Sequence, residues 1–400
     1  SFGEIGQRSW MAEFHEFWME AKAQGFGGSL EDYCLELKAA KANKFAKQVG
    51  KKTVNYAYHF NATAYATFLR SKSETAGVKR EEGFIEQVIK DETGNITSLT
   101  LGDGKEITGD FFIDCTGFKA LLIGASLDVG YQDWSHYLAA DSAIAVQTKA
   151  VEEPRPYTQA MAHSAGWQWR IPLQNRVGNG IVYSSKFLSD DEARTTLMGN
   201  LTGEPITEPR QLRFTTGRRE KAWHKNCVAV GLSSGFLEPL ESTSIHLVTT
   251  ALLRLMKMFP FGGNTALLAD QYNREVKLEA ETIRDFIILH YHLTARDDSP
   301  FWEHYRTMEI PESLAHRMAL FKENGYAWLD DVGLFRVDSW VQVMMGQGIM
   351  PEQHHKGSCV LPTEGLKEQM TALRNRVANA VAQLPQHSDF IKKYCPAKSN

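Results

Sequence analysis

Two short apolar runs, each ending at a glycine, constrain the fold of this chain more than any other feature. Residues 111–117 read FFIDCTG and residues 227–231 read CVAVG, and a helical pattern follows at 244–259. Uninterrupted apolar strands are typical of sheets buried on both faces, and such strands deliver their carboxyl ends to a ligand site. The two runs therefore predict an α/β fold with a ligand site where they end.

The residues before the first run predict two helices and a small sheet. Ser29 and Asp32 have the spacing of a capping box and predict a helix that continues to about Phe45. A second helix is expected to begin after Asn61 and to end at Gly77. Alternation of period two at 84–101, with turns at 93–95 and 102–104, indicates a β-meander.

A second sheet is predicted between about Trp134 and Trp223. Two of its strands are expected at 167–173 and 180–184, joined by a turn at 175–179. Beyond Asp270 the pattern is mainly helical, with prolines as breakers.

Composition excludes several classes of protein. The net charge of −4 and the lack of a basic run argue against nucleic acid as a partner. No apolar stretch has the length of a membrane span and no signal peptide opens the chain, so we expect a cytoplasmic protein. Five cysteines without CxxC spacing indicate neither a disulfide framework nor a zinc site, and we expect no metal.

Residues 231–245 gather a small-residue turn, two carboxylates and a helix start. Unpaired amides at Thr243 and Ser244, with the positive end of the helix dipole, suit a small anion such as a halide. In the alternative interpretation, Glu238 and Glu241 are acids of the first helical turn and Ser242 or Thr243 is an N-cap.

Two aromatic clusters are candidates for binding a flat ring. Alternation places Trp167 and Trp169 on one face of a strand, where they form a wall or, alternatively, part of the core. The second cluster, at 290–302, could line a pocket for a planar ring with a polar handle, although such histidines are often structural. Its candidate residues are His290, Tyr291, Asp297, Phe301 and Trp302.

The order of these stretches and the residues in them resemble those of the tryptophan halogenase family of flavin-dependent halogenases. The motif Trp-x-Trp-x-Ile-Pro ends in Ile171 and Pro172, and residues 231–243 match the family's active-site segment. Residues 110–123, Phe301-Trp302 and the chain as far as Pro396 are similar as well. Three motifs in register favour the functional interpretation over each separate alternative.

The resemblance implies electrophilic chlorination or bromination of an electron-rich ring. Reduced FAD, supplied by a separate flavin reductase, would react with oxygen and halide to give hypohalous acid. Thr243 and Ser244 would hold the halide, and Glu241, with Ser242 beside it, would act at the substrate as orienting group and general base. The expected cofactor-binding residues are Leu232, Ile245, Asp114, Gly117 and Gly231, and the motif wall is Trp167, Trp169, Ile171 and Pro172.

This chain departs from the family at the expected halide site and at the expected substrate site. Ser244 stands where the family usually has glycine, so the amide donor stays but backbone freedom is lost. His290-Tyr291 and Asp297 stand where enzymes acting on free tryptophan have a Tyr-Tyr pair and a glutamate. We therefore expect an indole or another small electron-rich aromatic in place of free tryptophan.

The resemblance also predicts a fold of flavoprotein monooxygenase type and an incomplete flavin domain. We expect flavin-domain residues at 1–125 and 225–260, a substrate-side β-rich sheet at 126–224 and a helical substrate region at 261–400, in a possible homodimer. No GxGxxG loop in strand-to-helix context occurs, since the cluster at 25–28 follows a helical pattern. From the resemblance we therefore expect that an amino-terminal segment carrying this loop is missing from these residues.

Two alternatives remain open at this point: a flavin-dependent aromatic hydroxylase, and a truncated inactive paralogue that only binds an aromatic ligand. Because the GxGxxG loop, which would bind the pyrophosphate of FAD, is not found, we predict that these 400 residues alone neither bind FAD tightly nor halogenate. Absorbance of the purified chain checks this, and stoichiometric bound FAD would contradict it.

Overall fold

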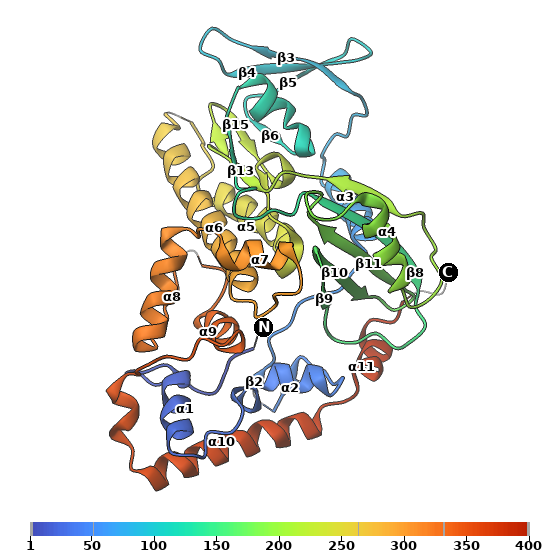
Figure 1. Cartoon of the computed structure of the whole chain (residues 1–400). Helices are drawn as coiled ribbons and strands as arrows, with labels where there is room; N and C mark the ends of the chain where they lie inside the picture. Colours follow the sequence, from blue (N-terminus) through green and yellow to red (C-terminus); the bar gives the residue numbers. More distant parts are fainter. Residues whose placement is uncertain (1–2, 51, 263, 331–332, 398–400) are drawn as a thin grey trace.

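The computed structural model describes residues 3–50, 52–262, 264–330 and 333–397, and a parallel pair of strands lies in its upper part in Figure 1. β6 (Phe112–Asp114) pairs in parallel with β15 (Cys227–Ala229), and β14 (Trp223–His224) adds to β15 antiparallel. The two apolar runs are therefore neighbouring strands whose carboxyl ends meet, as predicted.

Asp114 closes this end of the parallel pair. Its buried carboxylate accepts hydrogen bonds from the amide and hydroxyl of Thr116 and from the amides of Leu122 and Ile123, at 2.7–3.0 Å. These bonds bind the end of β6 to the start of the π-helix Leu121–Ser126. The turn after β6 is thus held by one side chain.

The predicted second sheet is present, and every pairing in it is antiparallel. The turn predicted at 175–179 is wrong: the Leu173 amide bonds to the Arg176 carbonyl at 2.8 Å, so the hairpin closes earlier and β11 begins at Arg176. The strands are, in spatial order, β12 (Arg210–Arg213), β8 (Ser142–Lys149), β11 (Arg176–Tyr183), β10 (Gly166–Pro172) and β9 (Gln159–His163).

The meander and the helix before it form as predicted. The side chain of Asn61 caps α3 (Ala62–Thr75), and Gly77 follows with a φ of +100°. The meander stands at one end of the molecule (Figure 1). Its strands are β3 (Ile85–Lys90), β4 (Ile96–Leu101) and β5 (Glu106–Thr108).

The single helix predicted up to Phe45 is wrong. The segment forms a 3₁₀ turn, Leu30–Tyr33, and then α2 (Leu35–Lys41), and the side chain of Ser29 makes no capping bond. Between them Cys34 is extended and forms a β-bridge with Ile5. Burial of Tyr33 and Cys34 against α1 (Phe14–Ala23) outweighs local helix propensity here.

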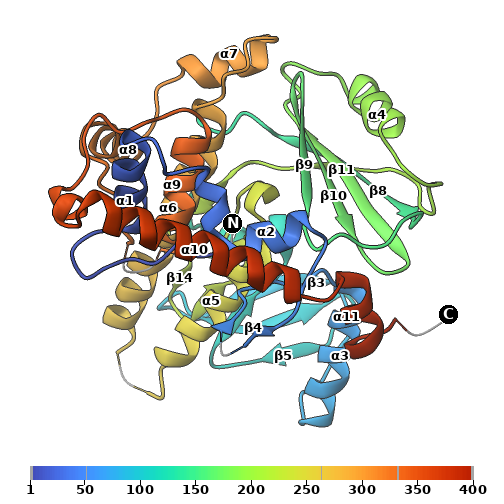
Figure 2. The same ribbon diagram turned by 90° about the horizontal axis from the view of Figure 1, so that it is seen from below.

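The carboxyl-terminal part is helical, as predicted, and its helices α6–α9 share a large core with the five-stranded sheet. Its last long helix, α10, runs across α1 and α2, so the two ends of the described chain pack together (Figure 2). These helices are α6 (Ala266–His292), α7 (Pro300–Thr307), α8 (Glu312–Asn324), α9 (Val337–Gly346), α10 (Thr363–Gln383) and α11 (His387–Tyr394).

The remaining elements are short or connect the larger ones. Within the described residues, no helix combines the length and apolarity that crossing a membrane requires. The remaining helices and strands are β1 (Gln48–Val49), β2 (Lys52–Thr53), β7 (Tyr131–Asp133), α4 (Asp190–Gly199), β13 (Gly217–Arg219), β16 (Gly235–Phe236) and α5 (Ser244–Lys257).

The Asp114 turn can be tested by stability. In Asp114→Asn, whichever way the amide is turned, an NH2 group faces two of the donors that the carboxylate accepted. We expect the free energy of unfolding to fall by about 2–4 kcal/mol, from the unsatisfied buried donors. Urea denaturation followed by circular dichroism measures it.

The matched control is Asp103→Asn, because Asp103 accepts the Lys105 amide in an exposed turn that asparagine also suits. This control should change stability by less than about 0.5 kcal/mol. Equal urea midpoints for the two variants would contradict the role assigned to Asp114.

Candidate active site

Each strand of the parallel pair is followed by a glycine in a left-handed conformation. Gly117 and Gly231 have φ of +71° and +73°. No atom lies within 4 Å of a Cβ added at Gly117, and at Gly231 such a Cβ meets only a Val248 methyl group, at 3.5 Å. A side chain is therefore disfavoured there by backbone conformation.

Apolar side chains lie exposed beside these glycines. Phe118 on the 3₁₀ turn Gly117–Lys119, Leu232 on the 3₁₀ turn Gly231–Ser233, and Ile245 on α5 are 48, 40 and 54% exposed. The first turn contacts the second, and the second contacts α5. An open backbone edged by apolar side chains suits a flat ring system, so Leu232, Ile245, Gly117 and Gly231 fit the predicted flavin.

Asp114 does not fit the role of a cofactor ligand. Its carboxylate is fully buried and accepts four hydrogen bonds from the chain itself. Its carbonyl oxygen accepts the Val230 amide at 3.0 Å and the Ser233 hydroxyl. Asp114 therefore supports the two turns from behind, and the prediction of direct contact is corrected.

A sharp turn connects β16 to α5 and carries the two glutamates. Glu238 precedes the 3₁₀ turn Pro239–Glu241, Ser242 is left-handed with a φ of +56°, and Thr243 leads into α5. A left-handed conformation is strained for a residue with a side chain. The turn places Glu241 next to the amino-terminal end of α5.

The start of α5 keeps its hydrogen-bond donors available. No side chain caps the helix, and its first turn contains no acidic residue. The Thr243 hydroxyl is buried and has no hydrogen-bond partner among the described residues. Thr243 occupies the N-cap position, as the alternative interpretation has it, but its side chain makes no capping bond and neither glutamate lies in the first turn of α5. The helix end remains a suitable place for an anion.

Glu241 is paired with a histidine from α6. Glu241 Oε1 lies 3.0 Å from His290 Nε2, and the two side chains are 25 and 22% exposed. His290 Nδ1 lies 2.8 Å from the Phe286 carbonyl oxygen. The structure thus joins two residues that sequence analysis had placed in separate motifs.

Glu238, three residues before Glu241, has the opposite environment. It is fully buried, and neither carboxylate oxygen has a hydrogen-bond partner among the described residues. Burial raises the pKa of Glu238 from 4.5 to about 7, against the smaller lowering effects of the nearby Tyr291 hydroxyl and of His290. One turn therefore carries a buried carboxyl and a partly exposed one.

The tryptophans of the motif lie side by side as predicted, with ring centroids 6.1 Å apart. Trp169 lies over Gly180 of the paired strand, where a Cβ would meet its ring at 2.0 Å. Trp167 is buried in the large core, and Trp169 packs against that core. Ile171 and Pro172 are half-buried at the end of β10.

The aromatic residues of the second cluster are core residues. Tyr291, Phe301 and Trp302 are buried, and Tyr291 stacks on Tyr305 at 4.3 Å. Asp297 is exposed in the loop after α6. The core encloses the three rings beside the His290 end of α6, and their contact with substrate stays a prediction.

A family model described as tryptophan halogenase matches residues 1–363. The chain belongs to the tryptophan halogenase family. It is 32% identical to RebH, a tryptophan 7-halogenase from Lentzea aerocolonigenes, over 98% of this chain and 79% of RebH. The predicted family is confirmed.

Solved structures agree with this assignment. Xcc4156, a flavin-dependent halogenase from Xanthomonas campestris, matches with a TM-score of 0.97 and 49% identity, over 100% of this chain and 81% of that chain. BrvH, a flavin-dependent halogenase from Brevundimonas sp. BAL3, matches with a TM-score of 0.94 and 40% identity, over 99% and 82%. The predicted α/β fold and halogenase function are confirmed, and the hydroxylase alternative is not supported.

Flavin-dependent halogenases use FADH2 supplied by a separate reductase and take a halide as co-substrate, acting on small aromatic molecules. Glycines 117 and 231 with their apolar neighbours fit the flavin, and the uncapped start of α5 fits the halide. The halogenase chain thus presents residues suited to both groups at one end of the parallel strands.

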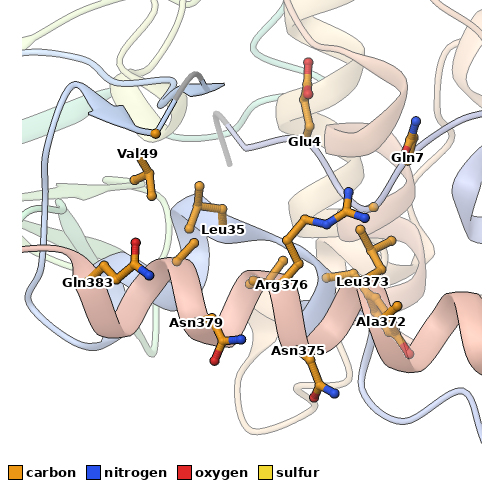
Figure 3. Close-up of a pocket in the computed structure, with 15 residues that line it drawn as sticks. Glu4, Gln7, Leu35, Val49, Ala372, Leu373, Asn375, Arg376, Asn379 and Gln383 are labelled. Atoms are coloured by element: carbon orange, nitrogen blue, oxygen red, sulfur yellow. The ribbon is translucent and has the colours of Figure 1, made fainter.

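A separate pocket of about 750 Å³ lies elsewhere in the halogenase, between α10, α2 and the residues that precede α1 (Figure 3). Glu4, Leu35 and Arg376 are among its lining residues. None of the predicted site residues lines it, so this pocket is distinct from the Glu241 region.

Folding also brings together a polar cluster that cysteine spacing could not reveal. Glu20 Oε2 lies 2.8 Å from His354 Nε2 and 3.2 Å from Cys359 Sγ. These residues come from α1 and from around the 3₁₀ turn Lys356–Val360. Their polar atoms satisfy one another in the halogenase.

The buried carboxyl makes stability depend on pH. Glu238 has a higher pKa in the folded chain than in the unfolded chain, so ionising it opposes folding. Below pH 4.5 the neutral carboxyl makes its full contribution to stability. As the pH rises to about 7 this contribution is lost, and the free energy of unfolding falls by about 3 kcal/mol in total.

Glu238→Gln removes this dependence. We expect the difference in free energy of unfolding, Glu238→Gln minus wild type, to rise by about 3 kcal/mol between pH 4.5 and pH 8. Urea denaturation of both proteins across this range measures the difference, with exposed Glu92→Gln as the control whose difference stays flat. A flat difference for Glu238→Gln as well would contradict the raised pKa.

Proposed function

We propose that this halogenase places chlorine or bromine on an indole or a similar electron-rich ring, with Glu241 at the reacting carbon. The observation that carries the proposal is the partly exposed Glu241 carboxylate next to the uncapped end of α5. An anion and a base are thereby available within one turn of the chain.

The halide is proposed to lie at the amides of Thr243 and Ser244. Support comes from the positive end of the α5 dipole and from the buried Thr243 hydroxyl, which has no partner among the described residues. Ser244 supplies an amide as glycine would. When bound, reduced FAD supplies with oxygen the oxidising equivalents that convert the halide into an electrophile.

Glu241 is proposed to orient the electrophile and to accept the proton that the ring loses. The left-handed Ser242 holds the carboxylate at this position. The Trp167 and Trp169 pair is proposed to separate the flavin from the substrate, with buried Trp167 fixing the half-buried Trp169. A positioned general base contributes roughly 10²–10⁴-fold to rate.

An indole is favoured over free tryptophan because the residues at the predicted handle-binding positions are engaged or distant. His290 contacts Glu241, Tyr291 is buried, and Asp297 is exposed in a loop. RebH, in contrast, is named a tryptophan 7-halogenase. A ring without an amino-acid group needs none of those contacts.

The pyrophosphate loop of the flavin site is proposed to come from a strand beside β6. β6 is an edge strand among the described residues, and its Ile113 is 45% exposed. An edge strand presents backbone N–H and C=O groups with which a further strand can pair. Residues 1–400 contain no GxGxxG sequence.

Glu241→Gln tests the base. In the protein that contains these residues, we expect the kcat for halogenated indole to fall by about 10²-fold or more, because the amide cannot accept the proton. Mass spectrometry with reduced FAD, oxygen and bromide or chloride measures product. Exposed Glu92→Gln should retain wild-type activity.

The substrate class is tested in the same assay by offering indole and free tryptophan side by side. Product must require halide. Hydroxylated product without halide, or a Glu241→Gln variant as active as wild type, would contradict the proposed function.

A further inference from the structure

The contact between Glu241 and His290 requires a proton between the two side chains. His290 Nδ1 is 2.8 Å from the Phe286 carbonyl oxygen, which can only accept a hydrogen bond, so Nδ1 carries a hydrogen. His290 Nε2 is 3.0 Å from Glu241 Oε1. Two lone pairs would face each other at this distance unless a proton lies between them.

Placed on Nε2, that proton lets both ring nitrogens of His290 donate a hydrogen bond, which only the imidazolium form does. Each side chain is about three-quarters buried, which strengthens their attraction relative to a fully exposed pair.

The charged groups that face His290 come from the turn before α5. Glu238, on the same turn as Glu241, interacts electrostatically with His290. On its own helix the ring of Phe286 packs edge-on, 4.9 Å away, and the side chain of Gln347, the residue after α9, donates to the His290 carbonyl. Among the described residues, the charged groups recorded against the imidazole are the two carboxyls of Glu238 and Glu241.

We propose that His290 is a positioning residue that holds Glu241 by Oε1 and so leaves Oε2 free to receive the substrate proton. This inference rests on the proposed function of Glu241. In the step itself a ring C–H bond breaks, its electron pair returns to the ring, and the proton moves to Oε2. Proton transfer alone needs no further reactant.

Nitrogen-15 NMR of histidine-labelled protein tests the pair without flavin or turnover. At pH 7.5 we expect both ring nitrogens of His290 to be protonated, and its signals are assigned with His290→Gln. His292 is an internal control, because its Nδ1 also meets a backbone carbonyl, Tyr305 O at 2.9 Å, but no carboxylate contact is recorded for it.

Glu241→Gln should convert His290 to the neutral form with its hydrogen on Nδ1, while the His292 signals stay unchanged. A neutral His290 in the wild type, or His290 signals that do not respond to Glu241→Gln, would overturn the proposal whatever the enzyme does in turnover.

Kinetics separate positioning from a merely structural role. His290→Phe should lower kcat roughly 10- to 100-fold with KM changed less than about twofold, since the base is misplaced and ring binding is kept. His290→Gln, which can still donate to Oε1, should recover most of kcat.

The outcomes distinguish this inference from the function on which it rests. A protonated His290 that responds to Glu241→Gln, together with full activity of Glu241→Gln, would refute the base and leave only the ion pair. An impaired Glu241→Gln variant together with an unimpaired His290→Phe variant would support Glu241 as the base and refute the positioning role of His290. Equal loss in His290→Phe and His290→Gln at every pH would also refute it.

Discussion

The hydrogen bonds of Asp114 are the constraint on which the active-site region depends. Its carboxylate binds the turn after β6, and its carbonyl oxygen binds the turn after β15 through Val230 and Ser233. Because both turns are tied to one buried residue, their glycines stay side by side. The chain that follows the second turn then leads directly to Glu238, Glu241 and α5.

Environment gives two carboxyls of one turn different properties. Glu238 lies in the core, where burial raises its pKa, whereas Glu241 is partly exposed and paired with His290. Carboxyls in contrasting environments commonly divide the work of a site. Here the buried carboxyl interacts with His290 from the core, and the partly exposed one is the carboxylate that we propose acts on the substrate.

Sequence patterns predicted the elements whose determinants are local: the two buried strands, the meander, the helix capped by Asn61 and the helix that begins at Ser244. They failed where distant residues decide. Cys34 leaves helical geometry because it pairs with Ile5, and Tyr291 is buried because α7 covers it. The Glu241 contact with His290 and the Glu20 cluster with Cys359 join residues far apart in the chain, and no spacing rule reports them.

The central claim is that a halide binds at the start of α5, within reach of the carboxylate that acts on the ring. Anomalous diffraction from crystals of the flavin-loaded protein grown in bromide tests it most directly. The account predicts a bromide peak within hydrogen-bonding distance of the amides of Thr243 and Ser244. Ordered bromide elsewhere in the protein, with none at the start of α5, would contradict it.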